Sequence, residues 1–341
     1  MSKIIIQNGN MCELDLPLKF AQKLYNEFAI RHPNAFYLRT RQRGMQNWDG
    51  KIHYITKTGQ FKIGLLPKVY DMCIEMGIKP KVVDMRQPLP KVSKVVTNIG
   101  KYKLRPEQEK AVKAVINNKI GNTPFHIGVL DYTVNAGKTL IMSSLYLSYK
   151  KQLKTLLITN DSDWLNQARE EFKQYLPGED ITFVQGKVLN WSNFTIGMVQ
   201  SISRNMRFYQ KELSQIDMVL IDEADQGGSK QYQNVITRLF NTRIRIGLSG
   251  TIYMSKLAKD RVKNMNLECF FGKVLAEFKL KDSIKKGYST KTVVKMVPGK
   301  PWYGNWESDC ISYKEIYDDS ITNCYTAWLM AYNRLLWNLN Q

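Results

Sequence analysis

The sequence predicts an α/β fold in which helices cover both faces of a parallel sheet, preceded by a small basic α+β domain. Short apolar runs alternate with segments of helical spacing through the middle of the chain, a pattern that favours parallel strands joined by helices. The runs that read as buried strands are residues 125–131, 155–160, 195–199, 218–222 and 244–249. Helical apolar spacing follows or separates them over residues 140–149, 164–175 and 232–240.

The first hundred residues lie outside this alternation and are strongly basic. They contain 16 lysines and arginines against seven acidic residues, and they end in a proline-spaced stretch. We therefore expect a separate small domain over residues 1–90, a linker around residues 86–100 and the main lobe over residues 91–285.

The basic residues of this first domain include an alternating run. Arg39, Arg41 and Arg43 have a spacing that, on a strand, places three guanidinium groups on one face. Such a face suits phosphates and suits plain solvent exposure equally well. Asp49-Gly50 between two alternating segments is a strong hairpin signal, and Trp48 beside it either packs on the core or belongs to the basic surface.

A loop suited to phosphates follows the first buried strand of the main lobe. Ala136-Gly137-Lys138-Thr139 lies between the strand at 125–131 and the helical spacing at 140–149. A glycine turn that opens into a helix offers backbone N–H groups and the positive end of the helix dipole. Lys138 would reach the β- and γ-phosphates, and the Thr139 hydroxyl would complete a Mg²⁺ shell. The match is imperfect, because the first glycine of the G-x-x-x-x-G-K-[ST] pattern falls on Tyr132.

A second string places carboxylates at the end of a buried strand. Residues 218–221 are apolar and are followed by Asp222-Glu223-Ala224-Asp225. Unpaired buried carboxylates are costly, and a Mg²⁺ ion resolves the cost. Asp222 would hold the metal through water and Glu223 would polarise the attacking water. The alternative is an acid-rich helix N-terminus. Lys138, Asp222 and Ser249 all follow strand ends, so one crevice at the carboxyl edge of the sheet can hold all three.

With these strings, the chain resembles the superfamily-two helicases, whose ATP-binding part is a RecA-like lobe of the P-loop NTPase class. Asp222 to Asp225 spell motif II, the DEAD-box position, and Ser249-Gly250-Thr251 occupies motif III. Residues 104–108 resemble the L-R-P-x-Q element, in which the Gln108 amide reads adenine. Residues 197–201 resemble motif Ib, which lies against a nucleic-acid backbone, whereas residues 159–162 depart from the V-P-T-x of motif Ia.

The N-terminal part carries its own resemblance. Residues 47–52 and 61–66 resemble the N-terminal domain of phage UvsW-type helicases, which contributes to DNA engagement. The resemblance implies an ATP-dependent DNA helicase or translocase that uses ATP and Mg²⁺. It implies action on branched or double-stranded DNA, such as forks, Holliday junctions or R-loops with an RNA–DNA hybrid, in phage recombination and repair.

The resemblance also implies roles for individual residues. The implied set is a nucleotide site of Arg105, Gln108, Asn135, Ala136, Gly137, Lys138 and Thr139; a metal held by Thr139 and Asp222; catalysis by Lys138, Asp222 and Glu223; coupling through Ser249 and Thr251; and nucleic-acid contacts from Arg39, Arg41, Arg43, Trp48, Lys51, Gln200 and Ser201.

The total charge agrees with a polyanionic partner. A formal charge of +20 and a pI near 9.6 favour salt-dependent binding to phosphates. Charge alone does not distinguish DNA from RNA or from an acidic protein.

The last part of the chain bears on whether the motor is complete. Residues 286–341 read as a connector and the start of a second lobe, with its first helix at 313–340. The sequence contains no Q-x-x-G-R-x-x-R string, the family's source of an arginine finger. We therefore expect an incomplete motor that a second polypeptide completes, as in a translocase complex, or a nucleic-acid-binding module without turnover of its own.

The remaining composition excludes several other classes. Five cysteines are scattered without C-x-x-C pairing, which indicates reduced thiols in a cytosolic setting and neither a disulfide frame nor a zinc site. No segment approaches 18 uninterrupted apolar residues. We therefore expect a cytoplasmic protein, in the host cytoplasm if phage-encoded, without a membrane partner.

Overall fold

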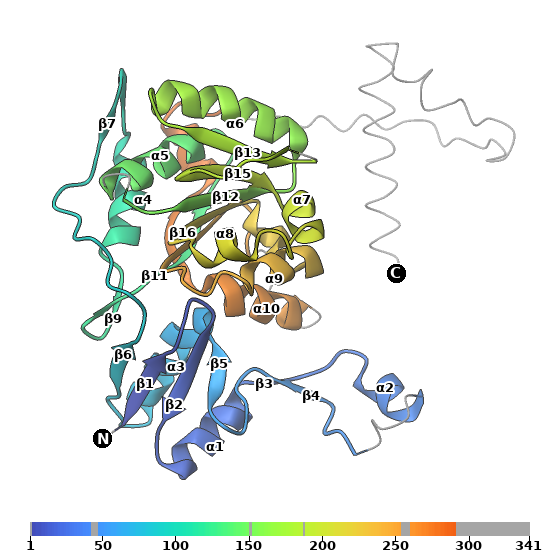
Figure 1. The fold of residues 1–341 in the computed structure, drawn as a ribbon. Coiled ribbons are helices and arrows are strands. Elements are labelled where there is room, and N and C mark those ends of the chain that lie inside the picture. Colours follow the sequence, from blue (N-terminus) through green and yellow to red (C-terminus); the bar gives the residue numbers. More distant parts are fainter. Residues whose placement is uncertain (1, 42–46, 150–151, 187, 254–259, 291–341) are drawn as a thin grey trace, which may run out of the picture. The chain divides into compact units, whose positions relative to one another are not determined.

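A computed structural model describes residues 2–41, 47–149, 152–186, 188–253 and 260–290. These residues belong to one compact unit and contain two principal sheets (Figure 1). The predictions made for Arg43, for the helix at 313–340 and for most of the connector lie outside the described residues.

The larger sheet contains eight strands in the order β14-β13-β15-β12-β16-β17-β11-β18. All are parallel to their neighbours except β14, which is antiparallel to β13. The predicted parallel α/β sheet is therefore confirmed, whereas β13, β14 and β18 were not predicted. The strands are β11 (His126–Tyr132), β12 (Thr155–Thr159), β13 (Ile181–Gln185), β14 (Val188–Leu189), β15 (Phe194–Met198), β16 (Met218–Asp222), β17 (Ile244–Ser249) and β18 (Val274–Phe278).

Helices cover both faces of this sheet, and its central strands are therefore buried throughout. Leu157 and Leu220 point into a cluster with α4 (Pro106–Ile116), α5 (Lys138–Ser148) and α6 (Ser162–Tyr175). Their strand neighbours, such as Ile158 and Ile221, point into a second cluster on the opposite face. The helices of that opposite face are α7 (Val199–Arg204), α8 (Gln210–Ser214), η2 (Ala224–Gly228), α9 (Lys230–Ile236) and α10 (Arg261–Phe271). Helix α11 (Leu280–Lys285) follows β18.

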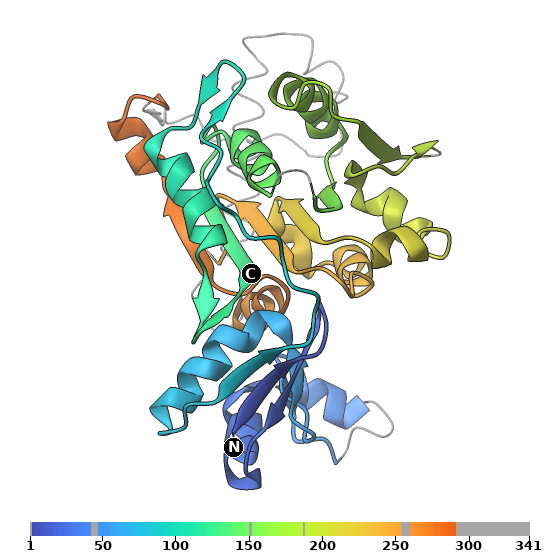
Figure 2. The same ribbon diagram turned by 60° about the vertical axis from the view of Figure 1, so that its left-hand side comes forward.

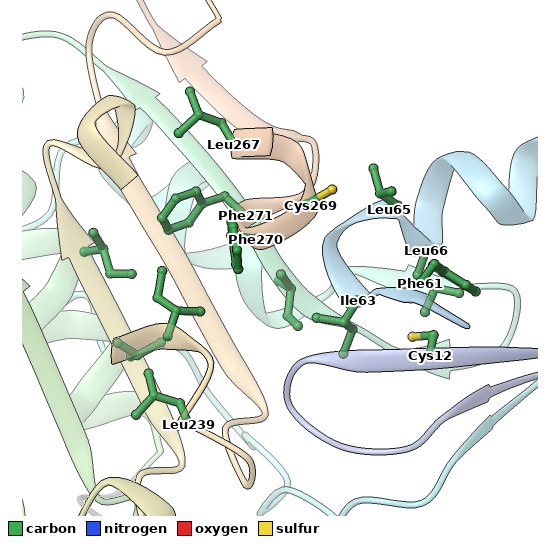
Figure 3. Close-up of a cluster of buried hydrophobic side chains, with 14 of the residues drawn as sticks. Cys12, Phe61, Ile63, Leu65, Leu66, Leu239, Leu267, Cys269, Phe270 and Phe271 are labelled. Carbon is green, nitrogen blue, oxygen red and sulfur yellow. The ribbon is translucent and has the colours of Figure 1, made fainter. Parts of the chain in front are cut away.

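The N-terminal part forms its own four-stranded sheet, in the order β5-β2-β1-β6. Its elements are β1 (Lys3–Ile6), β2 (Met11–Asp15), α1 (Leu18–Glu27), β5 (Gln60–Lys62), η1 (Ile63–Leu65), α3 (Leu66–Glu75) and β6 (Lys81–Asp84). Figure 3 shows Ile63 and Leu65 beside Cys269 and Phe270 of α10, in one continuous apolar cluster. The N-terminal sheet is therefore packed directly on the lobe, and the boundary at residue 90 stays a prediction.

Two short hairpins flank α4 in the sequence, one between β6 and α4 and the other between α4 and β11. They are β7 (Asn98–Ile99) with β8 (Tyr102–Lys103), and β9 (Lys119–Ile120) with β10 (Thr123–Pro124).

Arg39 and Arg41 do not lie on a strand, so the strand prediction is wrong for these two residues. Arg39 and Arg41 belong to α2 (Ala35–Arg41), a helix at the end of the ribbon made by β3 (Ala29–Arg31) and β4 (Lys51–His53) (Figures 1 and 2). Residues two apart on a helix point in widely different directions, so the two guanidinium groups do not share a face. The run of Ala, Phe, Leu and Arg is compatible with a helix, which the i, i+2 spacing alone does not exclude.

The Asp49-Gly50 turn begins β4 and does not close a tight hairpin. Gly50 has φ +77°, the Asp49 carboxylate accepts from the Lys51 N–H at 2.9 Å, and β4 pairs with the distant β3.

Two further features bear on the predicted setting. No helix in the described part of the chain is long and apolar enough to cross a membrane. Cys12, Cys73 and Cys269 are buried free thiols.

Candidate active site

The loop between β11 and α5 has the geometry of a phosphate cradle. Gly137 precedes α5 with φ +73°, and Asn135 also has a positive φ of 62°. A Cβ added at Gly137 would lie 2.3 Å from Nε2 of Gln108, so the position requires glycine. The first backbone N–H groups of α5 have no partner within the helix, and they open at this loop.

Side chains of the L-R-P-x-Q element form hydrogen bonds to the backbone of this loop. The Gln108 side chain is 1% exposed, its Oε1 accepts from the Arg105 N–H at 2.8 Å, and its Nε2 donates to the Ala136 carbonyl at 2.9 Å. The Arg105 guanidinium donates to the Asn135 carbonyl at 3.4 Å. The structure thus brings the predicted nucleotide residues together. In this arrangement the Gln108 amide serves the loop, and its contact with adenine stays a prediction.

The motif II carboxylates face the loop lysine. Lys138 Nζ lies 3.4 Å from Asp222 Oδ1 and 3.4 Å from Glu223 Oε1. Glu223 has φ +49°, an uncommon conformation for a residue other than glycine, where β16 ends. Burial raises the pKa of both carboxyl groups, and the nearby Lys138 ammonium opposes part of that rise.

The donor set fits a triphosphate with a magnesium ion. Asp222 is 2% exposed, and its Oδ1 has no hydrogen-bond partner among the described residues, although Lys138 is close. A buried carboxylate oxygen without a donor is costly unless a ligand or water supplies one. Thr139, at the start of α5, is also buried and offers a hydroxyl oxygen. Hard oxygen donors around an anion-binding loop are the ligands that Mg²⁺ accepts.

Motif III is tied to motif II by side-chain hydrogen bonds. The Ser249 hydroxyl donates to Asp225 Oδ1 at 3.0 Å, and the Thr251 N–H donates to Ser249 Oγ at 3.2 Å. Asp225, the last residue of the acidic string at 222–225, had no predicted role of its own. The coupling role of Ser249 and Thr251 stays a prediction.

The two residues of the lobe that were predicted to contact nucleic acid form hydrogen bonds to backbone groups of the protein itself. Gln200 Nε2 donates to the Asn160 carbonyl at 3.2 Å, and Ser201 Oγ accepts from the Gly186 N–H at 2.9 Å. Ser201 is also buried, so neither side chain is free in this structure. Their contacts with nucleic acid remain predictions.

Trp48 and Lys51 come together at the start of β4. The Trp48 Nε1–H donates to the Lys51 carbonyl at 2.9 Å, and the indole packs edge-on against His32 with ring centroids 5.7 Å apart. Trp48 is half-buried and is not part of the apolar core. The structure therefore leaves both residues at the surface near α2, and their nucleic-acid role also stays a prediction.

Comparison with known proteins adds independent observations. Residues 101–254 match the family described as "Type III restriction enzyme, res subunit". The chain is 22% identical over 228 residues to the ATP-dependent DNA helicase uvsW of Enterobacteria phage T4, a match that covers 60% of this chain and 43% of that protein. The chain therefore spans less than half the length of this relative.

Solved structures show the same fold. The crystal structure of the UvsW helicase from bacteriophage T4 matches with a TM-score of 0.62 at 20% identity, covering 82% of this chain and 99% of that one. A second structure of T4 UvsW matches with a TM-score of 0.60 at 20% identity, covering 82% of this chain and 56% of that one. The predicted RecA-like lobe is thereby confirmed. The segment over residues 101–254 that matches the family model therefore lies within a lobe that has the fold of these helicase structures.

Proposed function

We propose that this chain is the nucleotide-binding and DNA-engaging part of an ATP-dependent DNA helicase or translocase. The observation that carries the proposal is the convergence of Lys138, Asp222 and Glu223 at one edge of the sheet, with 3.4 Å from the ammonium to each carboxylate. Without phosphate, the single positive charge of the Lys138 ammonium offsets part of the negative charge of the two carboxylates. A bound triphosphate competes for the same ammonium with its own negative charge.

The side chains then divide the work. Lys138 and the N-terminal N–H groups of α5 hold the phosphates, while Thr139 and Asp222 hold Mg²⁺. The metal supplies positive charge where negative charge develops on the phosphate oxygens. Glu223 orients a water molecule and takes its proton, a task for which a raised pKa makes it a better base than an ordinary glutamate. The hydrogen bond from Ser249 to Asp225 couples a conformational change at the end of β16 to motif III.

The DNA partner is proposed from charge and from relationship. The formal charge of +20 favours a polyanion, and the relative named above is a DNA helicase. We propose branched DNA, such as forks, Holliday junctions or R-loops, as the substrate, with a role in phage recombination and repair.

Efficient turnover needs an arginine from a second lobe, which is typically worth about 10³ to 10⁵ in rate. We propose that this lobe comes from a partner polypeptide or from further sequence of the same protein.

Steady-state ATP hydrolysis with and without forked DNA tests the proposal. We expect DNA-stimulated hydrolysis that Glu223→Gln abolishes, weak for the chain alone and stronger once a second lobe is supplied. DNA binding with no hydrolysis under either condition would contradict the motor and leave a nucleic-acid-binding module. Failure to bind any DNA would contradict both.

A further inference from the structure

A hollow lies at the end of the β3–β4 ribbon, away from the nucleotide loop. It has a volume of about 430 Å³ and lies between α2 and the strands that flank it. Its lining residues are Arg31, Ala35, Phe36, Arg39, Thr40, Asp49 and Gly50. Ala35 is buried, and a Cβ on Gly50 would lie 3.2 Å from that of Ala35, so two small residues in close contact form its base.

Helical spacing decides which side chains of α2 share the hollow. Phe36, Arg39 and Thr40 are three and four residues apart, so they lie on one face of the helix. Tyr37 and Arg41 lie on another face, where the Arg41 guanidinium is 4.8 Å from the Tyr37 ring centroid. One arginine of α2 therefore pairs with an aromatic ring of its own helix, and the other faces the hollow.

The hollow carries net positive charge. Arg31 and Arg39 are exposed, and neither forms an ion pair with any residue that the structure describes. The acid in the lining, Asp49, is already engaged: its carboxylate lies 2.6 Å from His53 Nε2 and accepts from the Lys51 N–H at 2.9 Å. Two guanidinium groups therefore remain available to an anion.

The Phe36 ring, which lines the hollow together with these guanidinium groups, is not packed in the core. Phe36 is 80% exposed, and Ala35 is the buried residue of α2. A seven-residue helix gains little stability from its own hydrogen bonds, so exposing a phenylalanine on it brings no folding benefit. An exposed aromatic face next to unpaired cations is the combination that binds a nucleotide, with the base stacked and the phosphate paired.

We propose that this hollow binds one unpaired nucleotide of a DNA strand, with its base against Phe36 and its phosphate between Arg31 and Arg39. The inference rests on the proposed DNA partner and narrows it: the preferred substrate is DNA that presents an unpaired base at a branch or gap. A perfect duplex keeps its bases stacked and offers the hollow phosphates alone.

Fluorescence anisotropy with the full 341-residue chain tests this assignment. The probes are a forked duplex with one unpaired nucleotide at the branch, the same fork with an abasic residue there, and a perfect duplex. Phe36→Ala should weaken binding to the first probe about tenfold, the scale of one stacked base, and leave the other two unchanged. Phe36→Trp should restore the preference, and Arg39→Gln should weaken binding to the first two probes.

Tyr37→Ala is the matched control, because it removes an exposed ring from another face of the same helix. It should not alter the preference for the unpaired base. Equal losses for Phe36→Ala and Tyr37→Ala, or equal losses on the abasic and intact forks, would overturn the hollow while leaving DNA binding intact. Absence of binding to all three probes would overturn the proposed function as well. Thermal melts of each variant, expected to match the wild type, verify the fold.

Discussion

Replacing Arg245 with methionine should loosen the N-terminal sheet from the lobe. Arg245 lies on β17, is 0% exposed and therefore places a full positive charge inside the protein. Its guanidinium donates to the Gly9 carbonyl at 2.6 Å, to Asn10 Oδ1 at 2.7 Å and to the Phe270 carbonyl at 3.1 Å. Two of these three acceptors belong to the N-terminal part of the chain, so this side chain links the two sheets.

The magnitude follows from the groups left without partners. Methionine keeps most of the volume but donates no hydrogen bond, and three buried oxygens lose a donor at about 1–3 kcal/mol each. Part of this loss is offset, because a guanidinium that pairs only with neutral oxygens no longer has to be buried. We expect Arg245→Met to lower the free energy of unfolding by about 3 kcal/mol, near the upper end of ordinary single substitutions.

Urea unfolding of Arg245→Met, Asn10→Ala and the double variant measures both the loss and its origin. Residues that share a hydrogen bond couple, so the double variant should be more stable than the sum of the two single losses predicts, by about 1–2 kcal/mol. A loss under about 1 kcal/mol for Arg245→Met, or strict additivity, would refute the view that this guanidinium joins the sheets.

Two further outcomes test the loop and a buried histidine. Gly137→Ala should abolish nucleotide binding, since its Cβ would lie 2.3 Å from Gln108 Nε2, while Gly178→Ala, whose φ of +80° is similar but whose surroundings are open, should retain it in calorimetric titrations. Equal effects would contradict the steric argument. His126 lies 2.8 Å from the Val115 carbonyl through Nδ1, and burial lowers its pKa. Below about pH 6.5 this histidine is protonated in the unfolded chain but stays neutral in the folded chain. Urea unfolding should therefore show that the free energy of unfolding falls by up to about 1.4 kcal/mol for each pH unit by which the pH is lowered. His126→Gln should reduce that slope, and an unchanged slope would contradict the assignment.

The sequence predicted the central strands well, because their signal is local. Strands β16 and β17 were predicted with their observed ends, since both are buried throughout and most of their residues are apolar. Strands β13 and β18 were not predicted, because residues of both are half-buried or exposed and no long apolar run marks them. A strand at the edge of the sheet, such as β18, or next to a two-residue edge strand, such as β13, depends on its neighbours more than on its own composition.

The site was predictable where chemistry dictates residue type and unpredictable where distant contacts decide. Lys138, Asp222 and Glu223 meet as expected, because parallel strands deliver their carboxyl ends to one edge. The use of the Gln108 amide to hold the Ala136 carbonyl depends on a contact 28 residues away. Likewise, the sequence of β17 gives no sign that its arginine is buried, because that burial depends on contacts with the distant N-terminal part of the chain. The adjacent aromatics Phe36 and Tyr37 in a polar segment were the available signal for the hollow.

Equilibrium binding of Mg²⁺·ATP by the whole chain decides whether Lys138, Asp222 and Glu223 form a nucleotide site. Isothermal calorimetry should show binding that requires Mg²⁺, that Lys138→Ala abolishes and that Asp222→Asn uncouples from the metal. Lys110→Ala, an exposed lysine on α4, should bind as the wild type does. Nucleotide affinity that is indifferent to Lys138 and to Mg²⁺ would contradict the claim that these side chains form an ATP site.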